Sequence, residues 1–146
     1  MGDLPGSVLF CCDHNAVRSP MAEGAMKQIH GSRVFVQSCG VFSDMDVDGF
    51  MVAVAEEKGI DIRRHRGKSF DDMESWGDDI EAFDVIIALS PAAQRRALEY
   101  TRMFSIEVEY WPTLDPTALG DSREQKLSAY RQTRDQILER INSRFG

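Results

Sequence analysis

The chain has 146 residues, a length typical of one folded domain. Hydrophobic residues make up 42% of it and charged residues 28%, which excludes a disordered or collagen-like chain and favours a globular fold. Its 17 Lys and Arg against 24 Asp and Glu give a net charge of −7, which argues against a general nucleic-acid binder, because such proteins present a basic face.

The first part of the chain alternates a short apolar run with helical periodicity. Residues 7–12 are apolar and are predicted to form a buried strand. Ser19 has the residue type of a helix N-cap and Pro20 that of the first helical position, so a helix is expected to start there and to end at Gly31. Residues 33–37 are predicted to form a second strand.

A polar stretch separates this part from the next strand. Residues 38–48 are predicted to be a loop whose last residue, Asp48, caps a helix that ends at Gly59. Residues 61–79 have no regular pattern and are predicted to be a long surface segment.

The second half repeats the alternation of strand and helix. Residues 84–89 give the strongest strand pattern, and a helix is expected to start at Ser90, which precedes a proline. Residues 106–110 alternate apolar and polar side chains, as a half-exposed strand does. After a loop over residues 111–120, a capping-box sequence at Ser122 predicts the last helix.

This order of elements predicts the fold class. Strands that alternate with helices through short connections form parallel sheets covered by helices on both faces. We therefore predict a single α/β domain over residues 1–146, with a four-stranded parallel sheet and helices on both faces. Ligands of such sheets bind beyond the carboxyl ends of the strands, so the residues that follow each strand are the candidates for function.

The segment that follows the first strand carries the chemistry. Cys12 and Arg18 flank a five-residue loop, Asp13-His14-Asn15-Ala16-Val17, and a helix with Ser19 in its first turn follows at once. Backbone N–H groups of such a loop and a helix N-terminus bind a tetrahedral anion, and the same field favours a thiolate at Cys12. Arg18 offers two parallel donors to phosphoryl oxygens, so sulfur attack on phosphorus is the chemistry predicted. The plainer alternative is a buried Cys beside a surface Arg.

A partner acid is expected on the same edge of the sheet. Asp115 lies in the loop after the fourth predicted strand, and Pro116 stiffens that loop. We predict that Asp115 protonates the leaving oxygen; the alternative is that this pair only starts a turn.

Several segments of the chain resemble the low-molecular-weight protein tyrosine phosphatases. Residues 8–23 look like the signature of that family, and residues 38–40, 65–69 and 83–89 are similar to its later segments in the same order. Asp115 stands where the family keeps its acid.

The resemblance implies metal-free hydrolysis of phosphomonoesters through a phosphocysteine, with no cofactor. Cys12 would be the nucleophile, Arg18 the clamp on the phosphoryl oxygens, and Asp115 the general acid and then the base. Asn15, Ser19 and Ser38 would shape the loop and stabilise the thiolate. The substrate expected is a phosphotyrosine-containing protein or a small aryl phosphate.

Two other functions remain open. Arsenate reductases that are coupled to thioredoxin share this fold and loop, but they use further cysteines near the end of the third strand, and residues 89–94 hold none. A phosphate-binding module without activity is the other alternative, because Asp13 and His14 depart from the family pattern in the loop.

Cys11, Cys12 and Cys39 are too few for a disulfide framework, which predicts a reducing, cytoplasmic location. No run is long enough to cross a membrane, and no metal ligands are spaced as a site requires.

Overall fold

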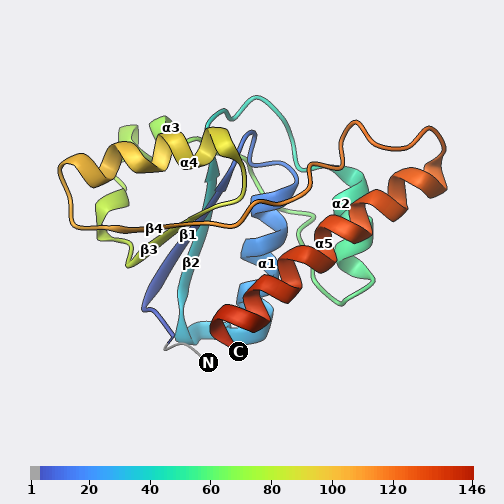
Figure 1. The fold of residues 1–146 in the computed structure, drawn as a ribbon, viewed down its shortest axis with the longest axis horizontal. Helices are drawn as coiled ribbons and strands as arrows, with labels where there is room; N and C mark the ends of the chain where they lie inside the picture. The colour runs from blue at the N-terminus through green and yellow to red at the C-terminus, as the bar shows by residue number, and fades with distance from the viewer. Residues whose placement is uncertain (1–3) are drawn as a thin grey trace.

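Four parallel strands form one sheet in the order β2-β1-β3-β4 in the computed structural model, which describes residues 4–146 (Figure 1). Their bounds are β1 Ser7–Cys12, β2 Phe35–Gly40, β3 Val85–Ala88 and β4 Glu107–Tyr110. The predicted fold class is confirmed, and of the predicted domain only residues 1–3 lie outside the described part.

The second strand is longer than the sequence pattern predicts. Residues 38–40 were expected in a loop, but they continue β2, because Ser38, Cys39 and Gly40 pair with the last three residues of β1. The extension brings the end of β2 level with Cys12, whose partner in the register is Gly40. Ser38 therefore lies beside the candidate loop.

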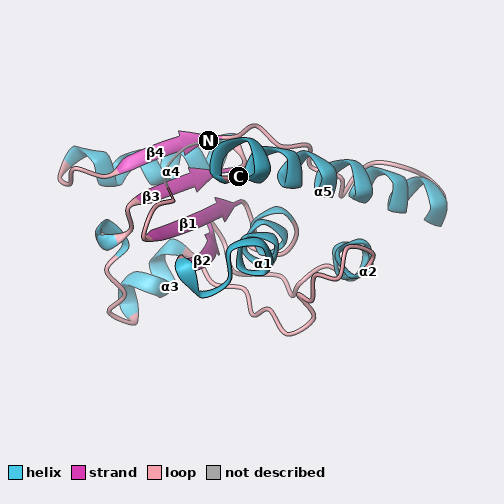
Figure 2. Cartoon of the chain, turned by 90° about the horizontal axis from the view of Figure 1, so that it is seen from below, coloured by secondary structure: helices cyan, strands magenta, loops and turns pink. Residues whose placement is uncertain are grey.

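Five α-helices are present among the described residues: α1 Arg18–His30, α2 Gly49–Glu56, α3 Phe70–Ser75, α4 Pro91–Leu98 and α5 Arg123–Phe145. Short 3₁₀ turns cover Gly31–Arg33, Ile80–Ala82 and Glu99–Arg102. Figure 2 shows the strands between α1 and α5 on one side and α3 and α4 on the other. No helix within residues 4–146 is long and apolar enough to cross a membrane.

Most of the predicted helix starts are confirmed, and one is corrected. Asp48, Ser90 and Ser122 each accept a backbone N–H of the first turn of their helix. In contrast, α1 starts at Arg18 rather than after Ser19, since the Ser19 hydroxyl contacts Cys12 instead of capping the helix. The segment predicted to be irregular, residues 61–79, contains the short helix α3.

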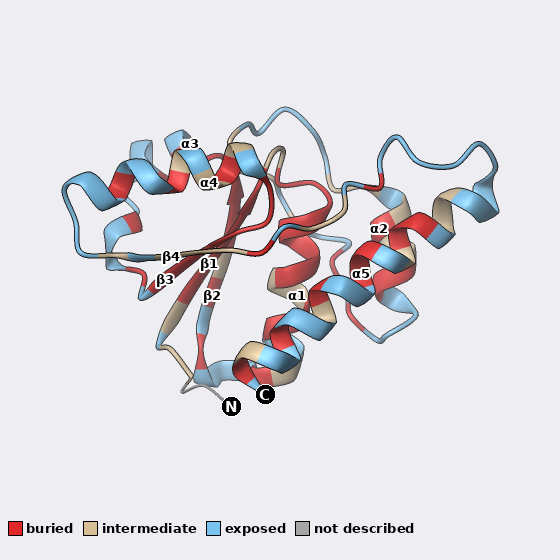
Figure 3. Ribbon diagram, viewed as in Figure 1, coloured by how far each residue is buried: buried red, intermediate tan, exposed pale blue. Residues whose placement is uncertain are grey.

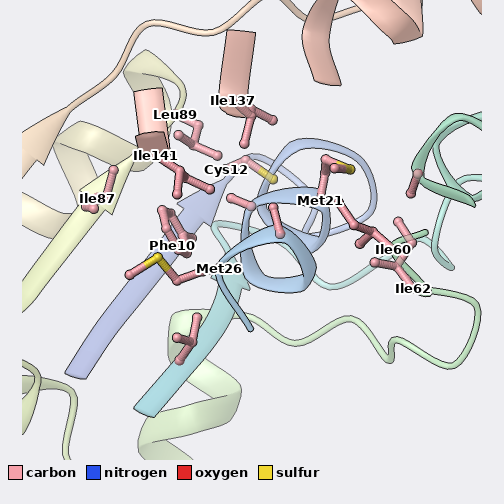
Figure 4. Close-up of a cluster of buried hydrophobic side chains, with 14 of the residues drawn as sticks. Phe10, Cys12, Met21, Met26, Ile60, Ile62, Ile87, Leu89, Ile137 and Ile141 are labelled. Carbon is pink, nitrogen blue, oxygen red and sulfur yellow. The ribbon is translucent and has the colours of Figure 1, made fainter. Parts of the chain in front are cut away.

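An apolar layer covers each of the two faces of the sheet. On one face, side chains of β1 and β3 pack against α1, α2 and α5, and Figure 4 shows Cys12 among them together with Phe10, Met21 and Ile137. On the other face, Cys11 and Cys39 pack with side chains of α3 and α4. The strands near the candidate site are buried, as Figure 3 shows, so the site stands on a rigid base.

Candidate active site

The predicted site residues meet at the carboxyl ends of the strands. A pocket of 140 Å³ lies there, and its lining comes from the loop after β1, from Met45, and from the loop after β4: Cys12, Asp13, His14, Ala16, Val17, Arg18, Met45, Asp115 and Thr117. Cys12 and Asp115 are 103 positions apart in the sequence (115 minus 12) and line the same pocket. A larger cavity, of 390 Å³, opens by Phe35 and Phe83 at the other end of the sheet, away from these groups.

Cys12 has two hydrogen-bonding partners, both from Ser19. Its Sγ lies 2.9 Å from Ser19 Oγ, and the backbone N–H of Ser19 donates to it at 3.4 Å. The Ser19 hydroxyl has a second acceptor, the carbonyl oxygen of Cys39 at 3.3 Å. When Cys12 is a thiolate, this hydroxyl hydrogen can turn to the sulfur, which stabilises the charged form.

The loop between Cys12 and Arg18 presents free backbone donors. Among the described residues, no acceptor receives the N–H groups of residues 13–17, although carbonyl groups of this loop are bonded: those of Asp13 and Ala16 accept from Phe42 and Asp48. Buried N–H groups are nearly always paired, and four of these five residues, Asp13, His14, Ala16 and Val17, line the pocket, so the loop is a candidate site for an anion.

Asn15 fixes the shape of this loop. It is fully buried and adopts the left-handed conformation, with φ at 54°, which is uncommon for a residue with a side chain. Its side-chain amide donates to Ser19 Oγ at 2.8 Å and to Ser38 Oγ at 3.0 Å, and its oxygen accepts from the backbone of Lys68 at 3.0 Å. These bonds connect the loop to Ser19 in α1, to Ser38 in β2 and to Lys68, and so hold it in place.

The same network contains two residues that the sequence analysis did not assign to the site. Ser38 Oγ donates to Glu23 at 2.5 Å, and His65 Nε2 lies 3.0 Å from Asn15 Oδ1. Burial lowers the pKa of His65, although the charge of Glu23 opposes this shift. Helical spacing was the signal for Glu23, because it is four positions after Ser19 and so on the same face of α1.

Arg18 is buried but keeps one side of its guanidinium at the pocket. Its Nη1 donates to the carbonyl oxygen of Thr113 at 3.2 Å, which fixes the side chain. Its Nη2 faces two carboxylates, 3.6 Å from Asp13 Oδ2 and 3.9 Å from Asp115 Oδ2. In the free protein these two carboxylates are therefore the nearest anions to Arg18.

Asp115 lines the pocket from the loop after β4, and its side chain is half exposed. Its Oδ1 accepts the backbone N–H of Thr117 at 3.1 Å and the Thr117 hydroxyl at 2.8 Å. Burial raises the pKa of Asp115, but these hydrogen bonds and the charge of Arg18 outweigh it and hold this pKa below its ordinary value. A bound dianion adds negative charge at this point and favours protonation of Asp115.

The rim of the pocket is charged. His14 Nδ1 lies 2.7 Å from Asp44 Oδ1, and this hydrogen bond lowers the pKa of Asp44. The His14 ring packs on Phe42, with ring centroids 5.6 Å apart. His14, unexpected in the loop, thus ties the mouth of the pocket to the loop after β2.

The other two thiols lie behind the site. Cys11 and Cys39 are partners in the β1–β2 register, both are fully buried, and both belong to the layer of α3 and α4. Burial raises the pKa of each thiol well above its ordinary value. Cys12 packs in the layer on the opposite face of the sheet, so neither thiol is placed to form a disulfide with it.

Comparisons with known proteins show the family and the fold of the chain. The family model of the low molecular weight phosphotyrosine protein phosphatases matches residues 7–144. A glutaredoxin arsenate reductase of Synechocystis sp. is 32% identical over 93% of each chain. Among solved structures, a low molecular weight protein tyrosine phosphatase from T. tengcongensis is similar with a TM-score of 0.74 and 25% identity, covering 93% of this chain and 95% of its own. An arsenate reductase in its phosphate-binding state has a TM-score of 0.66 and 29% identity, over 94% of each chain.

Proposed function

The chain belongs to the low molecular weight phosphotyrosine protein phosphatase family, and we propose that it hydrolyses phosphomonoesters through a phosphocysteine on Cys12. One observation carries this proposal. A pocket of 140 Å³ is lined together by Cys12, Arg18, Asp115 and four loop residues whose backbone N–H groups have no acceptor within residues 4–146: Asp13, His14, Ala16 and Val17.

The first step transfers the phosphoryl group to sulfur. The Cys12 thiolate attacks phosphorus while the loop amides and Arg18 hold the three remaining oxygens, where negative charge is concentrated. The phosphorus–oxygen bond to the leaving group breaks as the phosphorus–sulfur bond forms. Asp115, once protonated in the complex, gives its proton to the departing oxygen.

The second step returns the enzyme to its starting state. Asp115 is now a carboxylate and accepts a proton from water, whose oxygen attacks phosphorus. The phosphorus–sulfur bond breaks, inorganic phosphate leaves, and Cys12 is a thiolate again. Its hydrogen bonds from Ser19 stabilise the sulfur as leaving group.

Arsenate reduction is the second candidate, because the relatives of this chain include named arsenate reductases. Arsenate fits the same oxyanion loop, and Cys12 would displace one of its oxygens as water. A second thiol then attacks the sulfur of Cys12, the arsenic–sulfur bond breaks, and arsenite leaves with the two electrons that the two sulfurs lose, one each, as they form a disulfide. Cys11 and Cys39 lie on the other face of the sheet, so the second thiol would be an external one such as glutathione.

One pair of assays separates these functions. The protein is given p-nitrophenyl phosphate in EDTA without thiol, and separately arsenate with glutathione, glutaredoxin and a coupled measurement of NADPH consumption. Our proposal predicts release of nitrophenol in the first assay and its loss in Cys12→Ser. Arsenate-dependent NADPH consumption without release of nitrophenol would replace it by the reductase. Binding of vanadate without either turnover would indicate a phosphate-binding module.

A further inference from the structure

A hollow of 390 Å³ lies at the end of the sheet opposite the candidate active site. Two of its lining residues, Phe35 at the start of β2 and Phe83 before β3, stack with ring centroids 5.9 Å apart, and Phe35 is 59% exposed. Asp78 and Asp79 also line it, and neither forms an ion pair within the described part of the chain. This acidic hollow therefore joins an aromatic surface to unpaired negative charge.

A basic knob, made of Arg102, Met103 and Phe104, lies between α4 and β4. Met103 is 83% exposed, a larger fraction than for any other large hydrophobic side chain within residues 4–146, and Phe104 is 40% exposed. Arg102 is exposed, and in the same range its side chain has neither an ion pair nor a hydrogen bond. Adjoining exposed apolar side chains, unlike single ones, are typical of interaction surfaces.

The hollow and the knob lie along the same edge of the sheet. Because β3 and β4 are parallel and Val85 pairs with Glu107, the segments that precede these two strands lie at one edge. Phe83 belongs to one of these segments and the knob to the other. Figure 1 shows the connection from α4 to β4 and the starts of all four strands at this edge, whereas Cys12 ends β1 at the opposite edge.

The acidic side chains closest in sequence to the knob lie near other cations. Glu99 Oε1 is 3.8 Å from Arg96 Nη1. A hydrogen bond to Glu109, and then the charges of Glu109 and Glu107, raise the pKa of Arg144, which places Glu107 near that guanidinium. The positive charge of the knob is therefore available to an anionic group of another molecule.

The two features complement each other in charge and in shape. The knob is positive and carries a flexible thioether side chain, which packs well on aromatic rings, and the hollow offers two such rings beside two carboxylates. In a two-fold symmetric pair of chains, a surface that carries both halves meets itself, so each half finds its complement. The net charge of −7 makes two copies repel in general, so their contact is favoured where the knob supplies positive charge.

We propose that two copies of this chain form a symmetric dimer through this edge of the sheet. Met103 of each copy enters the acidic hollow of the other copy, between the aromatic rings and the carboxylates, and Arg102 pairs with the partner's Asp79. The proposal does not depend on the reaction, because the candidate active sites of both copies stay open at the far ends of the dimer.

Sedimentation equilibrium from micromolar to millimolar protein tests the dimer, and charge reversal tests its interface. The wild type should approach twice the mass of one chain, and no more. Asp79→Arg and Arg102→Glu each place like charges in both symmetric contacts, so each should weaken dimerisation by at least about a hundredfold. A mixture of these two variants has opposite charges in both contacts, so a dimer with one chain of each should form again. Met103→Ala, which removes the inserted side chain, should weaken the dimer by about tenfold.

Three variants outside the hollow and the knob are the matched controls. Glu124→Arg, Arg64→Glu and Leu119→Ala change exposed side chains of the same kinds and should leave dimerisation unchanged. Far-UV circular dichroism checks that every variant is folded. Hydrolysis of p-nitrophenyl phosphate by the same samples is measured separately, so failure of the dimer and failure of the proposed phosphatase function are distinguishable.

The outcomes that would overturn the dimer are distinct. A wild type that stays monomeric at millimolar concentration contradicts it, and so does a dimer that survives both charge reversals. Failure of the two mixed variants to pair would show that Arg102 and Asp79 do not meet. Assembly beyond two chains would replace the two-fold arrangement by head-to-tail contacts. A monomer that binds anionic lipid vesicles, and loses that binding in Arg102→Glu, would assign the knob to a membrane instead.

Discussion

The carboxylate of Asp13 lies 3.6 Å from the guanidinium of Arg18, the group expected to clamp the substrate. Asp13 is held there by Ser90, the N-cap of α4, whose hydroxyl donates to the other carboxylate oxygen at 2.6 Å. The free protein thus has its own anion next to Arg18, and a bound oxyanion must share that cation with Asp13.

This relationship predicts the effect of removing one charge. Asp13→Asn keeps the shape of the side chain and its contact with Ser90, but ends the competition for Arg18. We expect vanadate and inorganic phosphate to inhibit this variant about tenfold more strongly, since like charges at this range repel by about 1 kcal/mol or more. Asp78→Asn, which removes the same charge at the other end of the sheet, should leave inhibition unchanged. Weaker inhibition of Asp13→Asn would show that Asp13 organises the loop instead of competing.

Asp115 is expected to matter most for poor leaving groups. Asp115→Asn should lower kcat for phenyl phosphate on the order of 10²–10⁴-fold, because the departing oxygen then lacks its proton donor. The loss for dinitrophenyl phosphate should be much smaller, since that oxygen leaves without a proton. Equal losses for both esters would make Asp115 only a turn residue bonded to Thr117.

The direction of the pH dependence follows from the same residue. Asp115 must be protonated to act as a general acid, and a carboxyl group is protonated at pH values below its pKa. In the free protein the pKa of Asp115 lies below its ordinary value. We expect kcat for phenyl phosphate to fall as pH rises through the pKa of Asp115 in the enzyme–substrate complex. Asp115→Asn should remove that fall, and a pH profile that keeps it would assign it to another group.

Gly40 is predicted to be required for both stability and binding. A Cβ at this position would lie 2.7 Å from the backbone N of Asn15 and 2.9 Å from the carbonyl oxygen of Asp13, and neither backbone atom can move freely. Gly40→Ala should therefore lower the free energy of unfolding by about 1–3 kcal/mol, the usual cost of overpacking. We expect phosphate to raise the Tm of the wild type, and Gly40→Ala should abolish that rise. Gly49→Ala is the control, because a Cβ there meets nothing within 4 Å; a normal response to phosphate in Gly40→Ala would contradict this account.

Oxidation of the nucleophile should be only partly reversible. Cys12 is in a different apolar layer from Cys11 and Cys39, so a sulfenic acid on Cys12 has no neighbouring thiol to trap it as a disulfide. We expect peroxide to inactivate the protein, and dithiothreitol to restore only part of the activity as Cys12 proceeds to the sulfinic acid. Cys39→Ala should behave in the same way. Full recovery with a Cys12–Cys39 disulfide in the mass spectrum would contradict this prediction and favour the reductase.

The fold was largely predictable because local signals and burial agree along most of the chain. Ser90 and Ser122 cap their helices as their sequence context predicts. The start of α1 was not predictable, since the hydroxyl of Ser19 is used by the sulfur of Cys12 across the loop. The short helix α3 was missed because its capping box uses Asp72 where Glu or Gln is usual.

The candidate site also has features that the sequence predicts and features that only the structure shows. The spacing of Cys12 and Arg18 on one loop made it predictable that they lie together, and Asp115 lines the same pocket because its loop follows a strand of the same parallel sheet. The bond from Ser90 to Asp13 joins residues 77 positions apart, and that of His65 to Asn15 joins residues 50 apart. Side-chain pairs of this kind leave no period or motif in the sequence, so only the structure reveals them.

Trapping the covalent intermediate tests the central claim most directly. The protein is mixed with p-nitrophenyl phosphate, quenched in acid within one turnover, digested and sequenced by mass spectrometry. We predict a phosphoryl group on the sulfur of Cys12, and no such adduct in Cys12→Ser or in wild type that has been alkylated at Cys12 beforehand. Release of nitrophenol in a rapid first turnover without any phosphorylated Cys12, or with the phosphoryl group on another residue, would contradict the account.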